Sequence, residues 1–298
     1  MNHEEIIKSY FRYHFGVREE EVEIIKRLEG GMSNSNYVVR CSGKLYTFRI
    51  PGQNAEKFVS RTIEAQILDI VEKIGVDGNL LVRMDQDTGY KLSYFVEGSP
   101  LSELDPAAYY REAAAIMHKI HDSAYRADND YDPFVRLEIY ENYVIENGLT
   151  HGKGYADIKA KFLAFQEELR HLPKVLCHND TQPSNFIRTE KKELLLVDWE
   201  FGGNNDPLYD VACYGNNDFK FAVGLLPVYL GHNPTDEEWK RLYLWRTFQC
   251  LQWHNVALYK EATGLSAELH LDFMKIAEYY VELANRMFME AMKYANVG

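Results

Sequence analysis

One stretch of the chain, residues 177–203, constrains the fold more than any other. It reads CHNDTQPSNFIRTEKKELLLVDWEFGG. A polar cluster, an apolar run of strand length and a second acidic cluster are typical of a loop followed by a β-hairpin. The stretch could be a metal-binding hairpin with a carboxylate base, or a loop with Asx turns and a strand ending in a solvated acid.

The spacing of the polar residues favours the metal-binding interpretation. Protein kinases use a loop H-R-D-x-x-x-x-N, followed after a strand by a second metal-binding Asp. Here Asp180, Asn185 and Asp198 occur in that order, and Glu200 follows. Since Mg²⁺ prefers hard oxygen ligands, we expect Asn185 and Asp198 to hold it, with Glu200 bound directly or through water. Asp180 could then deprotonate an attacking hydroxyl, and we interpret His178 as a structural residue that fixes the loop backbone.

A phosphoryl-transfer site also needs groups that hold the nucleotide. Residues 29–34, EGGMSN, lie between two expected strands and could bind phosphate through backbone N–H groups. The same residues could equally form an ordinary hairpin turn. Arg49 lies on the third expected strand and could contact phosphate, with Glu64 on the following helix as its ion-pair partner. Each of these two residues alone could instead be a surface charge.

The pattern of apolar residues predicts two lobes. We expect an α+β fold in which residues 1–97 form a β-rich N-lobe, with a nucleotide lid and a five-stranded sheet plus helix, and residues 98–298 form a mostly helical C-lobe that carries the catalytic hairpin and the substrate pocket. Strands are expected near 21–28, 35–41, 44–50, 80–84 and 89–96. Helices are expected at 3–15, 56–74, 105–121, 155–170, 235–260 and 265–293.

Composition excludes several classes of protein. The formal charge of −12 argues against a nucleic-acid surface, although it would suit a cationic substrate. No apolar run is long enough for a membrane span, and the acidic start is unlike a targeting signal. The four scattered cysteines predict reduced thiols in a cytoplasmic protein.

Several segments together resemble the choline/ethanolamine kinase family, especially its bacterial choline kinases, within the aminoglycoside-phosphotransferase-like group of the protein-kinase-like superfamily. The matching segments are GGMSNSNYVV (30–39), TFRIPG (47–52), YFVEG (94–98), IMHKIHDS (116–123), VLCHNDTQPSNFI (175–187) and LVDWEFGGNNDPLYDVA (196–212). The resemblance implies a bilobal protein-kinase-like fold, ATP and Mg²⁺ as cofactors, and phosphorylation of a small alcohol.

The resemblance also implies roles for individual residues. Asp180 would be the catalytic base, and Asn185, Asp198 and Glu200 the metal set. The residues that the resemblance assigns to the nucleotide are Ser33, Asn34, Arg49, Glu64, Gln182 and the hinge residues Tyr94, Phe95 and Val96. Asp210 would support the catalytic loop together with His178.

The substrate is less constrained than the chemistry. A quaternary ammonium is held by aromatic faces beside a carboxylate. Trp253, Tyr259 and Tyr214, with Asp180, are the candidate substrate-binding residues, but Trp253 could equally be core. Relatives often have a second Trp where this chain has Val256. Choline or a related amino alcohol is therefore the expected substrate, with an aminoglycoside, thiamine-like or sugar-like alcohol, or a nucleotide-binding pseudokinase, as alternatives.

Overall fold

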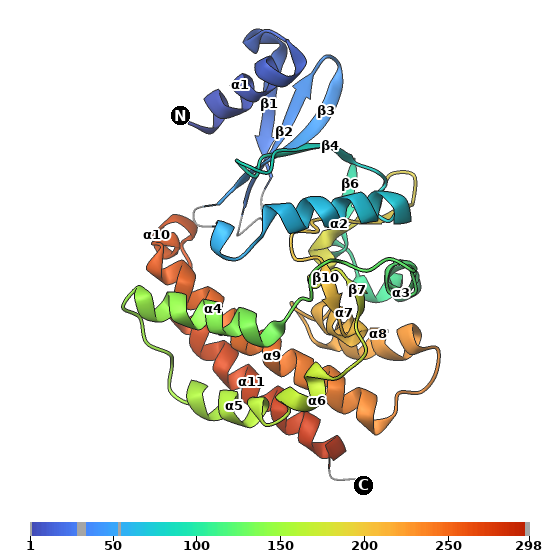
Figure 1. The fold of residues 1–298 in the computed structure, drawn as a ribbon, viewed down its shortest axis with the longest axis vertical. Coiled ribbons are helices and arrows are strands. Elements are labelled where there is room, and N and C mark those ends of the chain that lie inside the picture. Colours follow the sequence, from blue (N-terminus) through green and yellow to red (C-terminus); the bar gives the residue numbers. More distant parts are fainter. Residues whose placement is uncertain (1, 29–33, 53–54, 296–298) are drawn as a thin grey trace. The chain divides into compact units, whose positions relative to one another are not determined.

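The structure, a computed structural model, describes residues 2–28, 34–52 and 55–295 (Figure 1). It contains two compact units, Met1–Pro100 with Ile187–Phe201, and Leu101–Phe186 with Gly202–Gly298. The sequence prediction instead placed all of 98–298 in one lobe. The difference arises because strand β6 (Gly98–Pro100) pairs with β8 (Phe186–Thr189), which groups the hairpin after Asn185 with the N-terminal unit.

The N-terminal unit is built on the expected five-stranded sheet. All its strand pairs are antiparallel, in the order β1-β2-β3-β5-β4. The strands are β1 (Val22–Arg27), β2 (Asn34–Cys41), β3 (Lys44–Pro51), β4 (Leu81–Met84) and β5 (Lys91–Tyr94). Strands β2 and β3 are joined by Ser42-Gly43, both with positive φ, as a two-residue hairpin turn requires. The register of β3 and β5 sets Arg49 opposite Lys91.

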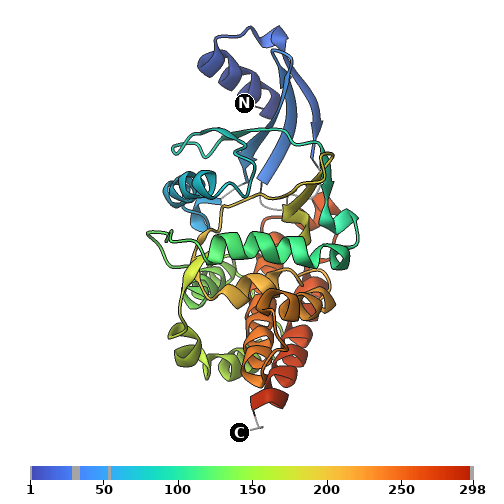
Figure 2. The ribbon, with the colours of Figure 1, turned by 90° about the vertical axis from the view of Figure 1, so that its right-hand side faces the viewer.

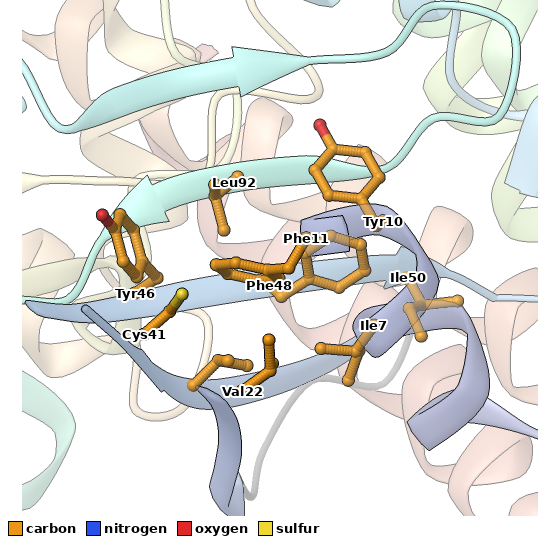
Figure 3. Packing of buried hydrophobic residues seen from close by; sticks show 10 residues of the cluster. Ile7, Tyr10, Phe11, Val22, Cys41, Tyr46, Phe48, Ile50 and Leu92 are labelled. Carbon is orange, nitrogen blue, oxygen red and sulfur yellow. The ribbon is translucent and has the colours of Figure 1, made fainter. Parts of the chain in front are cut away.

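Helix α1 (His3–Phe15) covers one face of this sheet (Figure 3). It begins with a capping box between Asn2 and Glu5. Tyr10 and Phe11 pack against Phe48 of β3, with the Tyr10 and Phe48 ring centroids 4.8 Å apart. The apolar cluster includes residues of α1 and of strands β1, β2, β3 and β5, so it holds the helix against the sheet.

A second helix and a small sheet complete the N-terminal unit. Helix α2 (Arg61–Ile74) is capped by Ser60 and ends at Gly75. Strands β6, β8 and β9 (Leu194–Leu196) form a three-stranded sheet. Gly98 is required here, because a Cβ atom at this position would lie 2.4 Å from the Arg188 carbonyl oxygen.

The C-terminal unit is helical, as expected, but it contains more helices than the sequence pattern predicted. Helices α9 and α11 lie side by side in both views (Figures 1 and 2). The helices are α3 (Tyr110–His121), α4 (Pro133–Glu146), α5 (Tyr155–Leu163), α6 (Gln166–Arg170), α7 (Pro207–Cys213), α8 (Lys220–Leu230), α9 (Asp236–Ala262), α10 (Leu265–Leu269) and α11 (Phe273–Ala295).

Three of these helices were missed for identifiable reasons. Helix α4 exposes apolar residues such as Val135 and Ile139, which weakens its periodicity. Helix α8 contains Pro227, a residue that normally ends a helix. Helix α7 is only seven residues long. The segments expected as single helices at 155–170 and 265–293 are each divided into two.

A short antiparallel pair positions the loop that holds Asp180. Strand β7 (Val175–Cys177) leads into this loop and pairs with β10 (Gly203–Asn205). Helix α7 follows β10 directly, with Asp206 as its N-cap. The four cysteines are buried and free. Among the described residues, no helix is long and apolar enough to cross a membrane.

Candidate active site

The N-terminal unit holds a buried ion-pair network centred on Arg49. The two guanidinium nitrogens Nη1 and Nη2 donate to Glu64 at 2.7 and 2.6 Å, so the predicted pair is confirmed. Lys91, which the sequence reading missed, donates to the same carboxylate at 2.9 Å. Burial alone would raise the pKa of Glu64, but Lys91 and Arg49 outweigh it and lower that pKa to about 2. Glu64 is therefore ionised and holds two cations in place.

Two further carboxylates face this network. Glu200 accepts a hydrogen bond from Asn34 at 2.8 Å and lies 3.5 Å from Arg49. Asp198 is more exposed and lies 3.8 Å from Arg49 and 3.9 Å from Lys91. Burial and the neighbouring Asp198 charge raise the pKa of Glu200 to about 7. Near neutral pH, Glu200 is therefore only partly ionised.

These residues fit the phosphates and metal that a kinase uses. Arg49 is buried, and in the described part of the chain its Nε has no hydrogen-bond partner, which suits a phosphate oxygen. Asp198 and Glu200 offer the hard oxygen donors that Mg²⁺ prefers, and a cation there would relieve the repulsion that raises the Glu200 pKa. Asp198 has a left-handed φ of 70°, a conformation rare outside glycine and frequent at functional sites.

The structure describes some, but not all, of the other residues that were predicted to bind the nucleotide. Ser33 lies outside the described residues, whereas Asn34 is buried beside Glu200. In the hinge segment, the Tyr94 and Phe95 N–H groups donate to the carbonyls of Leu80 and Leu45. Because these two N–H groups are already used, a hinge contact to adenine would have to come from the carbonyl oxygens of the segment or from Val96.

In the C-terminal unit, Asp210 anchors the loop that contains Asp180. Its carboxylate accepts the backbone N–H groups of His178 and Asn179 at 2.9 and 2.7 Å. Asn179 has a left-handed φ of 64°, and these two hydrogen bonds stabilise the turn. The His178 ring accepts the N–H of Asp180 at 3.1 Å. Both His178 and Asp210 thus contact the loop backbone.

The loop brings two amide side chains to the Asp180 carboxylate. Gln182 and Asn185 each donate an amide N–H to Asp180 Oδ2, at 3.1 and 3.0 Å. Asn185 also donates to the Asp180 carbonyl at 2.8 Å. With its Nδ2 used in this way, Asn185 would present its Oδ1 to a metal. Gln182, predicted as a nucleotide contact, donates to Asp180 in this structure.

Two buried residues next to Asp210, His121 and Tyr229, were not among the predicted site residues. His121, at the end of α3, contacts Asp210 through Nε2 at 3.0 Å and the Tyr229 hydroxyl through Nδ1 at 2.8 Å. All three side chains are buried. A histidine at the end of an amphipathic helix was the available sequence signal, but its partner Asp210 lies 89 residues away.

A pocket of about 500 Å³ lies in the C-terminal unit. It is lined by residues 216–219 with Arg246, Tyr279, Tyr280 and Leu283. Hydrogen bonds connect it to the loop: Arg246 donates to Gln249, Gln249 donates to Cys213, and the Cys213 thiol donates to the Asn179 carbonyl. The pocket wall is therefore joined to the residue next to Asp180.

Of the three predicted aromatic substrate contacts, the structure contradicts Tyr214, and Trp253 and Tyr259 are not among the residues that line this pocket. Tyr214 is fully buried, and its hydroxyl donates to the Pro106 carbonyl, so it belongs to the core. Trp253 stacks on Tyr280, and the Lys260 Nζ lies 5.9 Å from the centroid of its ring. Tyr259 packs edge-on against Tyr143. The aromatic residues that do line the pocket are Phe219, Tyr279 and Tyr280, from segments whose proximity depends on helix packing.

Known proteins resemble this chain in sequence and in fold. The chain is 28% identical over 189 residues to the protein LicA of Haemophilus influenzae, covering 61% of this chain and 55% of LicA. It is 27% identical over 258 residues to human ethanolamine kinase 1, covering 78% of this chain and 52% of that protein. The chain thus spans about half the length of these relatives.

The fold is that of choline kinases and aminoglycoside phosphotransferases. The choline kinase LicA from Streptococcus pneumoniae superposes with a TM-score of 0.76 at 22% identity, covering 97% of this chain and 99% of that one. An aminoglycoside 2'-phosphotransferase, solved as a GDP complex, gives 0.66 at 16% identity, with 95% and 97% covered. The expected protein-kinase-like fold is confirmed.

The sequence pattern that describes choline/ethanolamine kinases matches residues 25–229. This range includes Arg49, Glu64, Asp180, Asn185 and Asp198, which form the two networks described above. The chain belongs to the choline/ethanolamine kinase family.

Proposed function

We propose that this chain is an ATP- and Mg²⁺-dependent kinase that phosphorylates the hydroxyl of choline or a related small amino alcohol. The observation that carries the proposal is the loop around Asp180, where Gln182 and Asn185 orient one carboxylate and Asp210 holds the backbone. Family membership supports the reaction class. A cytoplasmic site of action is consistent with ATP as the donor.

Asp180 is the proposed base. Its carboxylate is held by two amide donors, so an acceptor hydroxyl can give up its proton to a group of defined position. The reaction breaks the bond between the γ-phosphorus and the bridging oxygen, forms the bond to the substrate oxygen, and leaves the proton on Asp180. The amide donors and Asp210 supply orientation, which is the main contribution a protein makes to phosphoryl transfer.

Arg49 and the carboxylates of the N-terminal unit are the proposed nucleotide residues. Arg49 is held rigidly by Glu64 and would bind phosphate oxygens, and Asn185, Asp198 and Glu200 would hold Mg²⁺. When bound, Mg²⁺ would neutralise charge on the phosphoryl group that is transferred. Arg49 stands where protein kinases use a lysine. Lys91 donates a hydrogen bond to the same Glu64 carboxylate that holds Arg49.

The pocket joined to the loop through Arg246 is the proposed acceptor site. Its polar lining would also suit a second candidate, a larger hydroxylated substrate such as an aminoglycoside. The fold similarity to aminoglycoside phosphotransferases supports this candidate. A pseudokinase is disfavoured, because Arg49, Asp180, Asn185 and Asp198 are all retained.

A coupled ATP-consumption assay with choline, ethanolamine, thiamine and several aminoglycosides tests the proposal. We expect turnover with an amino alcohol in the presence of Mg²⁺. Asp180→Ala should lower kcat by about 100- to 10,000-fold, with ATP affinity unchanged. Asp157→Ala, at an exposed position on α5, is the matched control. Turnover of aminoglycosides alone would contradict the substrate class, and an active Asp180→Ala variant would remove Asp180 from its role.

A further inference from the structure

The proposed acceptor pocket contains a buried positive charge. Arg246 is only 2% exposed, and its guanidinium donates to the neutral side chains of Asn216 and Gln249. Within the described part of the chain, it forms no ion pair with a carboxylate. Its guanidinium carbon lies 5.8 Å from the centroid of Phe219, another wall residue. The chain therefore places its own cation on an aromatic face of the pocket.

Other aromatic residues in or beside the pocket also have a basic side chain over one face. Arg286 lies over Tyr279 at 5.9 Å. Lys260 lies over Trp253 at 5.9 Å, and Trp253 in turn stacks on Tyr280 with an interplanar angle of 20°. A trimethylammonium group binds mainly through aromatic faces, because it has no N–H to donate. One face each of Phe219, Tyr279 and Trp253 is therefore already covered by a basic side chain of the protein.

The same pocket is well equipped for a group that donates hydrogen bonds. Asn217 and Asp218 line it, and Tyr279 and Tyr280 are further wall residues that carry hydroxyls. A primary ammonium is small and has three N–H donors, so amide, carboxylate and hydroxyl oxygens of this kind can hold it. Asp218 is half exposed and pairs with Lys220 at 2.6 Å, so it adds an acceptor without making the pocket strongly anionic.

We infer that Arg246 is a specificity-determining residue, which makes the acceptor pocket select a primary-amine alcohol and exclude a quaternary one. The inference rests on the proposed kinase function and concerns the acceptor pocket alone. The positive charge of Arg246 on Phe219 opposes a second cation at that face. A primary ammonium can offset this repulsion by hydrogen bonds to the polar residues that line the pocket, whereas a quaternary ammonium has no N–H to donate.

The test is a methylation series of one alcohol. Steady-state kinetics with ethanolamine, its N-methyl and N,N-dimethyl derivatives and choline should show kcat/KM falling along the series, by at least about tenfold overall. Calorimetric binding of the same four compounds to the wild-type protein gives the ranking without turnover. Choline equal to or better than ethanolamine in both measurements would overturn the inference.

Two variants separate charge from shape. Arg246→Gln removes the charge and keeps amide donors for Asn216, whereas Arg246→Lys keeps the charge. A cation–π contact is worth about 5- to 30-fold, so the choline-to-ethanolamine ratio should rise by about that factor in Arg246→Gln and stay within about twofold in Arg246→Lys. Equal ratios in both variants would overturn the role of Arg246.

The outcomes remain distinguishable from failure of the proposed function. If no alcohol is phosphorylated, the kinase proposal fails, and the calorimetric ranking still decides which head group the pocket accepts. If Arg246→Gln does not fold, judged by thermal melting, the wild-type series decides. A preference for choline with normal kinase activity would leave the proposed function intact and overturn only the inference about Arg246.

Discussion

Replacing Glu200 by glutamine should remove a pH dependence of stability from the N-terminal unit. Burial and Asp198 raise the pKa of Glu200 from 4.5 to about 7, and glutamine keeps the oxygen that accepts from Asn34. Between pH 4.5 and 7 the folded state holds a proton that the unfolded state has lost. Stability from this group is therefore complete below pH 4.5 and is lost as the pH rises through 7.

The magnitude follows from the size of the pKa change. A rise from 4.5 to about 7 corresponds to about 3 kcal/mol in the free energy of unfolding. Urea unfolding at several pH values between 4.5 and 8, with a chelator present, should show the wild type losing about this much relative to Glu200→Gln. Glu193→Gln, exposed on the same hairpin, should behave as the wild type does.

A direct titration checks the same reasoning. The ¹³C signal of the Glu200 carboxyl, assigned by its disappearance in Glu200→Gln, should titrate near pH 7. Adding Mg²⁺ with a nucleotide should move the midpoint to lower pH, because a cation favours the ionised carboxylate. A midpoint near 4.5, or identical pH slopes in the wild type and Glu200→Gln, would refute the argument.

Two further substitutions probe the buried charges. Glu64→Gln should destabilise the protein by about 3–5 kcal/mol at pH 7, measured by urea unfolding, because it leaves Arg49 and Lys91 without their carboxylate; exposed Glu72→Gln on the same helix is the control, and an equal effect of both would contradict this. Burial lowers the pKa of Lys260 from 10.5 to about 7, so wild-type stability should rise between pH 7 and 10. Lys260→Met should lack this rise and be more stable at pH 6, by up to about 5 kcal/mol, and a wild type equally stable at both ends would contradict it.

The order of residues along the chain was enough to predict part of the polar network in each unit. Arg49 and Glu64 could be paired because Arg49 lies in an expected strand and Glu64 in the helix that follows it. The loop with Asp180 and Asn185 was readable because its partners lie within five residues. Residues that are close in sequence within one loop or hairpin stay close in space when the chain folds. Their contacts can therefore be predicted from local spacing.

Partners that lie far apart in sequence were not predictable in the same way. Lys91 joins the Arg49 network only because β5 pairs with β3, an order that no local pattern specifies. Trp253 lies seven positions before Lys260 on one helix, so a shared face was visible in principle. That the ammonium covers the indole, and that Tyr280 stacks on that ring, depended on how α9 packs against α11.

The amino-acid order by itself determined the class of fold, the family and the composition of the Asp180 loop, because helix, strand and turn preferences and short-range hydrogen bonds act between near neighbours. Only the tertiary structure decided which aromatic side chains line the pocket and which charges stand beside them. Those choices depend on the packing of helices that are distant in sequence, and packing brings together residues such as Phe219 and Arg246 that no periodicity relates.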